Sequence, residues 1–284
     1  MISLRQRPTS SLILIMMVLV GIAFIVVRFY YRDKNLSVDP RIAPARDLYG
    51  NYDRYARLSQ LDSIFPLLDS IEASYRAIPH YRESYETGVL YVNRAAAWLT
   101  ISMFRDSIPD YRHGKFYGEL PADSLNQMAE SALLFAISSY ESWIDRFGSI
   151  AKDSIAPLIR SSFLEETGRW TDREAEKYFK NRILEIRDAQ VETPRRLSVA
   201  YTNLGILCRM RGQYEDAARH YQKALELWDR NLTAENNLNR LLGRPQKKDN
   251  WLRRMFPPEK VRSTSPPYPL SQGRGGGGKY EQNQ

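Results

Sequence analysis

The sequence is poor in the residues from which covalent cross-links and metal sites are made. It has one cysteine, Cys208, and three histidines, His80, His113 and His220, in 284 residues. A single cysteine excludes any disulfide within the chain, and so few cysteines and histidines leave little for a clustered zinc or iron site. With 43% apolar residues, the chain is still able to bury a sizeable core. We therefore expect a protein stabilised by packing, with no metal and no cofactor.

Recognised catalytic motifs are missing as well. No glycine-rich phosphate loop follows a strand, no HExxH sequence occurs, and no serine or cysteine lies in a nucleophile motif. Cys208 lies on the apolar face of a predicted helix, which is more typical of a small core residue than of a nucleophile. The sequence predicts no catalytic residue and no small-molecule substrate, and indicates that the protein is not an enzyme.

The middle of the chain has no excess of positive charge, although the net charge of the whole chain is +8. Residues 1–46 carry seven basic and two acidic side chains, and residues 244–284 carry nine and three. Residues 47–243 carry 25 basic and 28 acidic side chains, and the two signs alternate along the sequence. Such mixing is typical of a solvated surface rather than of a phosphate-binding stripe. We expect no binding of nucleic acid.

One long apolar run stands near the start of the chain. Residues 9–27 contain no charged side chain and are flanked on both sides by arginines. As a helix, this run spans roughly 28 Å, close to the hydrocarbon thickness of a bilayer. It predicts a transmembrane anchor within residues 1–32 and a single-pass protein of a bacterial inner membrane or plasma membrane. The flanking charges leave the side of the membrane open, and a signal peptide cleaved near Ala23 is the alternative.

The remainder of the chain divides into parts by composition. Residues 33–46 contain two prolines and no apolar periodicity, and predict an extended linker. Residues 47–243 have apolar residues at helical spacing and no alternating pattern, which makes the fold class all-α. The basic tail, residues 244–284, is rich in proline and glycine and is expected to be disordered.

Helices are predicted at about 51–77, 80–104, 122–147, 150–166, 171–190, 196–211, 214–230 and 232–242. Pro66 is expected to bend or split the first of them, and Pro79, Pro121 and Pro194 to stand where helices begin. The short links between helices predict antiparallel hairpins. The longer link at 105–120 is a candidate lid over a site containing His113, which is the basis of an alternative reading as a helical enzyme.

Residues 198–231 carry the clearest local pattern. Tyr201, Leu204 and Cys208 share one face of a first helix, and an apolar stripe from Ala217 to Trp228 follows a second. Gly205 and Ala217 are small, which lets two antiparallel helices cross closely. Gly212 follows a turn that carries two arginines, and it is suited to end the first helix in the left-handed conformation.

These residues resemble the pattern of the tetratricopeptide repeat family, whose repeat has 34 residues. The positions that match, and to which the resemblance gives packing roles, are Tyr201, Leu204, Gly205, Gly212, Tyr214, Ala217, Tyr221 and Ala224. Asp229 stands where the family usually has proline, which puts the last turn of the second helix in doubt. The resemblance implies an α-solenoid in which residues 47–195 form degenerate helical hairpins and residues 196–243 form one repeat and a closing helix.

The resemblance also implies a protein or peptide partner on the concave side of the array. The residues expected there are Thr202, Asn203, Ile206, Arg209, Met210, Asn237 and Arg240. We interpret the chain as a membrane-anchored scaffold or adaptor that recruits or assembles partner proteins, and that contacts the lipid bilayer through residues 9–27. The alternative is a permanent structural subunit of a secretion or envelope-assembly complex.

Overall fold

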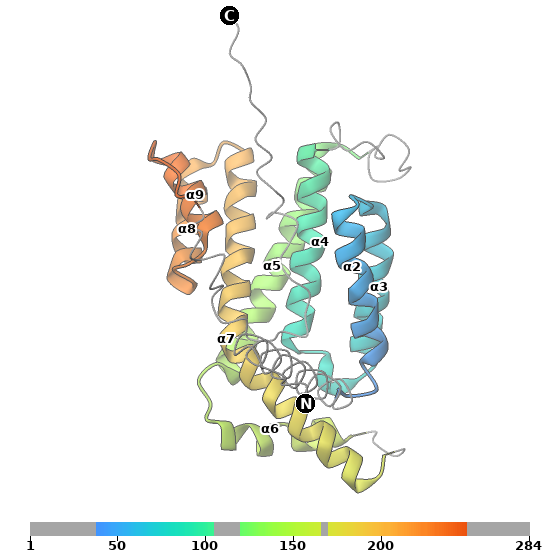
Figure 1. Ribbon diagram of the computed structural model, residues 1–284. Coiled ribbons are helices and arrows are strands. Elements are labelled where there is room, and N and C mark those ends of the chain that lie inside the picture. Colours follow the sequence, from blue (N-terminus) through green and yellow to red (C-terminus); the bar gives the residue numbers. More distant parts are fainter. Residues whose placement is uncertain (1–37, 105–119, 166–169, 249–284) are drawn as a thin grey trace, which may run out of the picture.

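The computed structural model describes residues 38–104, 120–165 and 170–248 (Figure 1). Within these ranges the regular elements are helices, and none is a strand. They are α2 (Ala43–Arg57), α3 (Leu61–Arg76), the 3₁₀ turn η1 (Pro79–Tyr81), α4 (Tyr85–Phe104), α5 (Ala122–Phe147), α6 (Lys152–Leu164), α7 (Asp172–Met210), α8 (Tyr214–Leu227) and α9 (Leu232–Leu241). The all-α prediction is confirmed, and the arrangement is consistent with an α-solenoid.

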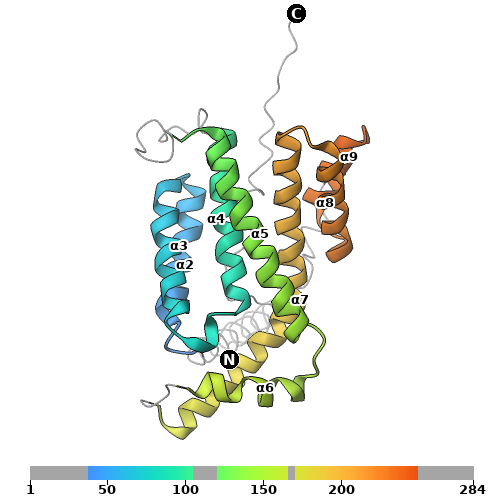
Figure 2. The same ribbon diagram turned by 180° about the vertical axis from the view of Figure 1, so that it is seen from behind.

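The helices form neighbouring hairpins, as both views of the ribbon show (Figures 1 and 2). The α2–α3 hairpin borders α4, which pairs with α5. The C-terminal half of α7 packs against α5 on one side and against α8 and α9 on the other. The N-terminal half of α7 runs below the hairpins and pairs with α6. Thus α7 is the element that contacts most of the others.

The predicted membrane localisation is corrected. No helix in the described part of the chain is long and apolar enough to cross a bilayer. The apolar run at residues 9–27, on which the prediction rested, lies outside the described residues. We therefore do not retain the single-pass assignment or the bilayer as a partner.

The helical body begins earlier than expected. Helix α2 starts at Ala43, inside the stretch 33–46 that was expected to be an extended linker. Pro44 lies in its first turn, where the fixed φ of proline and its missing N–H do no harm. Ile42 and Ala45 are fully buried against the core. Residues 43–46 form only the first turn of α2, and one turn is too short to show apolar periodicity. The sequence therefore did not reveal that the helix begins there.

The break between α2 and α3 lies at Ser59 and not at Pro66. Ser59 has a φ of 57°, and the N–H of Gln60 donates to the carbonyl of Tyr55 (2.9 Å), which closes the end of α2. Pro66 lies inside α3, just after its first turn, and does not interrupt it. A proline at this position removes one backbone hydrogen bond of the helix, and α3 continues through it. Pro79 and Pro121 do stand where η1 and α5 begin, as predicted.

Pro194 does not begin a helix. The two helices predicted at 171–190 and 196–211 are one helix, α7, with Pro194 in its interior. The helix changes direction in its middle (Figure 1), which is the usual effect of an internal proline. Thr171 starts α7 with a capping box, because its hydroxyl accepts from the N–H of Glu174 while the Glu174 carboxylate accepts from the N–H of Thr171.

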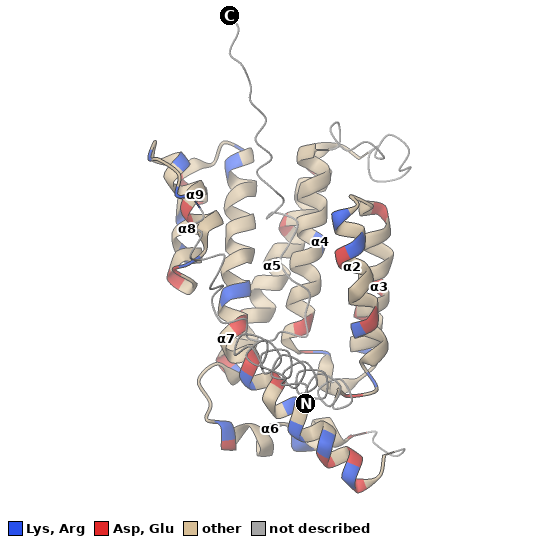
Figure 3. Cartoon of the chain, viewed as in Figure 1, with Lys and Arg blue, Asp and Glu red and all other residues tan. Residues whose placement is uncertain are grey.

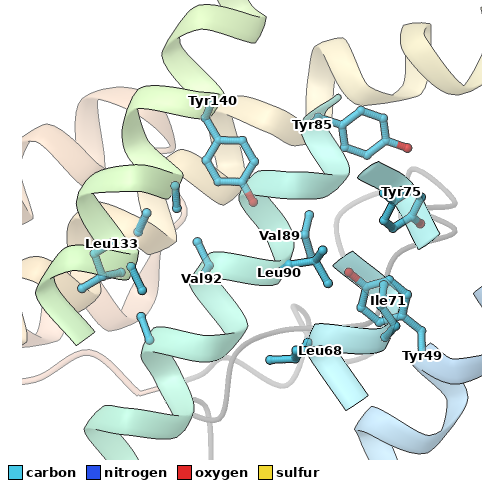
Figure 4. Packing of buried hydrophobic residues seen from close by; sticks show 14 of the residues in the cluster. Tyr49, Leu68, Ile71, Tyr75, Tyr85, Val89, Leu90, Val92, Leu133 and Tyr140 are labelled. Atoms are coloured by element: carbon cyan, nitrogen blue, oxygen red, sulfur yellow. The ribbon is translucent and has the colours of Figure 1, made fainter. Parts of the chain in front are cut away.

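A glycine–tyrosine contact holds the α4–α5 hairpin together. The ring of Tyr140 lies so close to Gly88 that a Cβ at this position would overlap it. Figure 4 shows Tyr140 pointing from α5 toward α4, beside a core built from Leu68, Val89 and Leu133. Because Gly88 has no side chain, α4 and α5 approach closely along this edge.

A buried ion network connects the N-terminal half of α7 to the hairpins. Arg182 is 2% exposed, and its Nη1 donates to Glu86 Oε1 (2.7 Å) and to Glu185 Oε2 (3.2 Å). Arg46 of α2 donates to Glu185 Oε1 (2.7 Å). Two guanidinium groups and two carboxylates thus compensate one another, which is the condition under which charges are tolerated in a core.

His80 extends this network to α6. The Nε of Arg182 donates to His80 Nε2 (3.0 Å), so the ring proton resides on Nδ1, which donates to Ser162 Oγ (3.1 Å). Burial lowers the pKa of His80 to about 2, and the positive charge of Arg182 acts in the same direction. The imidazole is therefore neutral. The Arg182 guanidinium also stacks on the ring of Tyr81, 4.4 Å from its centroid.

Replacing Arg182 by methionine is expected to lower the free energy of unfolding by about 3–5 kcal/mol, because Glu86 is left as an uncompensated buried charge. Methionine fills much of the volume of the arginine side chain, so the loss of stability reports on the removal of the guanidinium charge. Urea unfolding followed by circular dichroism measures it. The matched control is Arg187→Met, an exposed position on the same helix. Equal stabilities of the two variants would contradict a role for the network.

The free energy of unfolding is expected to decrease as the pH is lowered below 6.5, because of His80. The unfolded histidine titrates near 6.5 and the folded one near 2, so between these values the unfolded state binds the extra proton. The slope is up to about 1.4 kcal/mol per pH unit. In His80→Gln the slope between pH 6.5 and 5 should be smaller by this amount. His220, whose pKa is also lowered, contributes equally to both proteins, and an unchanged slope would refute the assignment.

Candidate partner-binding surface on the repeat hairpin

The α7–α8 crossing is built on a second glycine–tyrosine contact. A Cβ added at Gly205 would lie 2.6 Å from Cε1 of Tyr221, so only glycine lets the ring lie flat against α7. Tyr221 is fully buried, as are Ala217 and Ala224 on the same face of α8. The structure thus brings Gly205, Ala217, Tyr221 and Ala224 together at this helix crossing.

The turn between α7 and α8 depends on Gly212. Its φ of +75° lies in the left-handed region, which glycine adopts without strain. The N–H of Gly212 donates to the carbonyl of Arg209 (3.1 Å), and that of Gln213 to the carbonyl of Cys208 (2.9 Å). These two hydrogen bonds form the Schellman motif that closes a helix end, as the sequence suggested.

Asn231 organises the link between α8 and α9. Its Nδ2 donates to Ser198 Oγ (2.8 Å) and to Thr202 Oγ1 (2.9 Å), and its Oδ1 accepts from the N–H of Ala234 (3.1 Å). One buried amide therefore caps α9 and binds it to α7. Sequence reasoning missed this role, although an asparagine just before a helix is a capping signal. Helix α8 ends at Leu227, before Asp229, where the repeat pattern departs from the family.

Three of the expected packing residues make other contacts. Leu204 belongs to the main core cluster, whereas Ala217 and Tyr221 belong to a second cluster. The hydroxyl of Tyr201 donates to Glu141 of α5 (2.8 Å), and its ring stacks on His220 of α8. Tyr214 is 61% exposed at the start of α8. Tyr201 thus connects the repeat to its neighbour α5, and Tyr214 is largely open to solvent.

Three of the expected concave residues are buried in the body instead of lying open on its surface. Thr202 accepts from Asn231, and Ile206 packs with Cys208 and Tyr221 under α9. Asn203 is 0% exposed, and neither its Oδ1 nor its Nδ2 has a hydrogen-bond partner among the described residues. Leu238 and Leu241 of α9 pack on the same cluster, so the closing helix covers part of the face that was expected to be free.

The other four expected residues remain accessible at the end of α7 and along α9. Met210 is 37% exposed and Arg240 is exposed, while Arg209 and Asn237 are half-buried. Burial raises the pKa of Tyr221 to about 12, and the nearby charges of Arg209 and Arg240 act in the opposite direction. The charges of both guanidinium groups thus act on one tyrosine, whose hydroxyl has no hydrogen-bond partner among the described residues. Figure 3 shows positive charge at the upper end of α7, above an uncharged stretch.

The single cysteine of the chain lies within the repeat hairpin. Cys208 is buried, and burial raises the pKa of its thiol, so the nucleophilic thiolate is disfavoured. In the part of the chain that the structure covers, no group of three His, Cys, Asp or Glu residues is placed to hold a metal ion. His113 and nearly all of the 105–120 link lie outside the described residues.

The close crossing at Gly205 can be tested with a matched pair of substitutions. Gly205→Ala should lower the free energy of unfolding by about 1–3 kcal/mol through overpacking against Tyr221. Gly50→Ala, in α2 with open space around the new methyl group, should raise it by about 0.5–1 kcal/mol through helix propensity. Gly205→Leu should be worse than Gly205→Ala. Thermal and urea unfolding measure the three values, and a stabilising Gly205→Ala would contradict the crossing.

Comparison with known proteins agrees with the geometry of this hairpin. The family model of the tetratricopeptide repeat matches residues 198–231, from the last turns of α7 to the start of α9. No curated protein and no solved structure matches the chain. Residues 198–231 are thus similar to a tetratricopeptide repeat, a module that typically binds proteins and is not catalytic.

Proposed function

We propose that the chain is a protein-interaction scaffold that holds a segment of a partner protein against the end of α7 and the outer side of α9. The match to the tetratricopeptide repeat supports the class of function. The observation that carries the proposal is the pair Arg209 and Arg240. The charges of both act on the pKa of Tyr221. The Nε of Arg209 is buried without a hydrogen-bond partner, and neither guanidinium forms an ion pair with a carboxylate within the described ranges.

The chemistry of this pair defines the kind of segment that would bind. A guanidinium group offers a planar fork of donors that matches a carboxylate. Met210 adds an exposed, flexible apolar side chain beside Arg209. A partner segment that presents an acidic side chain next to an apolar one would satisfy both. Asn237, half-buried one turn before Arg240, offers a further amide on the same helix.

Asn203 supports the same face of α7 as the binding side. It lies seven residues, or two helical turns, before Met210, so the two side chains share one face. Asn203 itself is 0% exposed, so it lies beneath this face of α7. On this reading the partner segment meets Met210 at the surface, and Arg209 holds its carboxylate.

The test combines site-specific crosslinking with charge reversal. A photoreactive amino acid at position 210 should give a discrete protein adduct in the native cells, and Arg209→Glu should reduce its yield at least about tenfold, because like charges now face one another. Arg187→Glu, the same change at an exposed position far along α7, should leave the yield unchanged.

An adduct that is insensitive to Arg209→Glu, or absent, would refute this surface. The same experiment separates a scaffold that recruits partners from a permanent subunit. A permanent subunit would co-purify with the crosslinked protein at a fixed stoichiometry without crosslinking, whereas a recruited partner would be lost on dilution.

A further inference from the structure

Residues 244–248, which follow a two-residue turn after α9, are folded back along that helix. Gly243, with a φ of +65°, ends α9, and the N–H of Arg244 donates to the carbonyl of Asn239 (2.8 Å). Pro245 then prevents any continuation of the helix. From Arg244 to Lys248 the chain has no helical structure, and it passes first Arg240 and then Asn236. This segment therefore runs antiparallel to α9.

Asn236 binds the backbone of the segment. Its Oδ1 accepts from the N–H of Lys247 (2.8 Å), and its Nδ2 donates to the carbonyl of the same residue (3.0 Å). A neighbouring β-strand would offer the same donor and acceptor pair to an extended residue. Recognition of this kind requires an extended backbone at position 247 and does not depend on the side chain there.

Two other side chains of α9 bind side chains of the segment. Glu235 forms an ion pair with the ammonium group of Lys247. The amide oxygen of Gln246, in the orientation that matches donors with acceptors, accepts from Arg240 Nε (3.1 Å) and Nη2 (2.9 Å). We call Glu235, Asn236 and Arg240 the α9 edge. The α9 edge thus binds a segment in which a side chain that accepts hydrogen bonds is followed by a lysine.

The segment can leave without unfolding α9. Residues 242–248 are all exposed, so water and salt weaken each of these contacts. Helix α9 has its own supports, because Asn231 caps its first turn and Ala234 is fully buried. Its apolar side packs on the cluster that contains Tyr221. The segment therefore occupies the α9 edge, but helix α9 does not need the segment in order to fold.

We propose that the α9 edge is a recognition site for an extended glutamine–lysine segment, and that residues 244–248 are its resident, displaceable occupant. A tether this short gives the resident segment a local concentration on the order of millimolar, which keeps a free segment of the same sequence out. Occupation also engages Arg240, so release of the segment makes this guanidinium available. The inference goes beyond the proposed function and needs no identified partner for its test.

The first test measures hydrogen exchange at the amide of Lys247 in the full chain. Asn236→Ala removes its acceptor and should speed exchange about fivefold, the factor that corresponds to one net hydrogen bond. Asn239→Ala, which removes an amide side chain from the same helix and keeps the backbone carbonyl that accepts from Arg244, should leave the rate unchanged. An unaltered rate in Asn236→Ala would overturn the contact on which the site depends.

The second test uses a fluorescein-labelled peptide with the sequence of residues 243–250, added to the full chain. Lys247→Glu in the chain puts a carboxylate next to Glu235 and releases the resident segment, so the chain should bind the peptide at least about tenfold more tightly than the unaltered chain. Lys248→Glu, an equal change of charge at a residue that α9 does not contact, should bind it as weakly as the unaltered chain.

Charge exchange completes this test. The double variant Glu235→Lys, Lys247→Glu restores the pair with reversed charges, so it should again exclude the peptide. If Lys247→Glu binds the peptide no better than the unaltered chain, or binds a peptide with glutamate at position 247 equally well, the α9 edge is not a recognition site. Failure of the acidic partner surface would not alter either outcome, because no partner protein takes part.

Discussion

The buried guanidinium of Arg182 is the constraint on which the arrangement of the helices depends. It lies in the N-terminal half of α7 and is paired with Glu86 of α4, Glu185 of its own helix and the neutral ring of His80. A charge in such a place is stable only while all of these partners hold their positions. The network therefore fixes how α7 meets the N-terminal hairpins, and α7 in turn carries the repeat.

Two glycines then decide how closely the hairpins pack. Gly88 receives the ring of Tyr140 in the α4–α5 hairpin, and Gly205 receives the ring of Tyr221 in the α7–α8 hairpin. The α7–α8 hairpin contains the residues that match the repeat family, and the α4–α5 hairpin does not. Both nevertheless use a contact between a glycine and a tyrosine ring. Tyr221 is also the residue whose pKa is raised by burial and lowered by the charges of Arg209 and Arg240. Core packing and the proposed binding surface thus share one tyrosine.

The local elements were predictable, and the long-range contacts were not. The sequence predicted α5 and the Gly212 turn closely, because periodicity, prolines and glycine act within a few residues. It divided α7 at Pro194, since it contains no sign that α5, α6 and α8 would hold both halves in one helix. The Arg182 network joins residues about a hundred positions apart, and no spacing rule reveals such pairs. For the same reason, sequence placed Thr202, Asn203 and Ile206 on an open face that the fold buries.

The central claim is that α7 is one cooperative element that fixes the repeat to the rest of the protein. Native-state hydrogen exchange along α7 tests it most directly, because it resolves the free energy of opening for each amide. The account predicts equal opening free energies, close to that of global unfolding, for residues 176–189 and 197–208 on the two sides of Pro194. A residue range 176–189 that opens at a much lower free energy, while 197–208 stays protected, would contradict it.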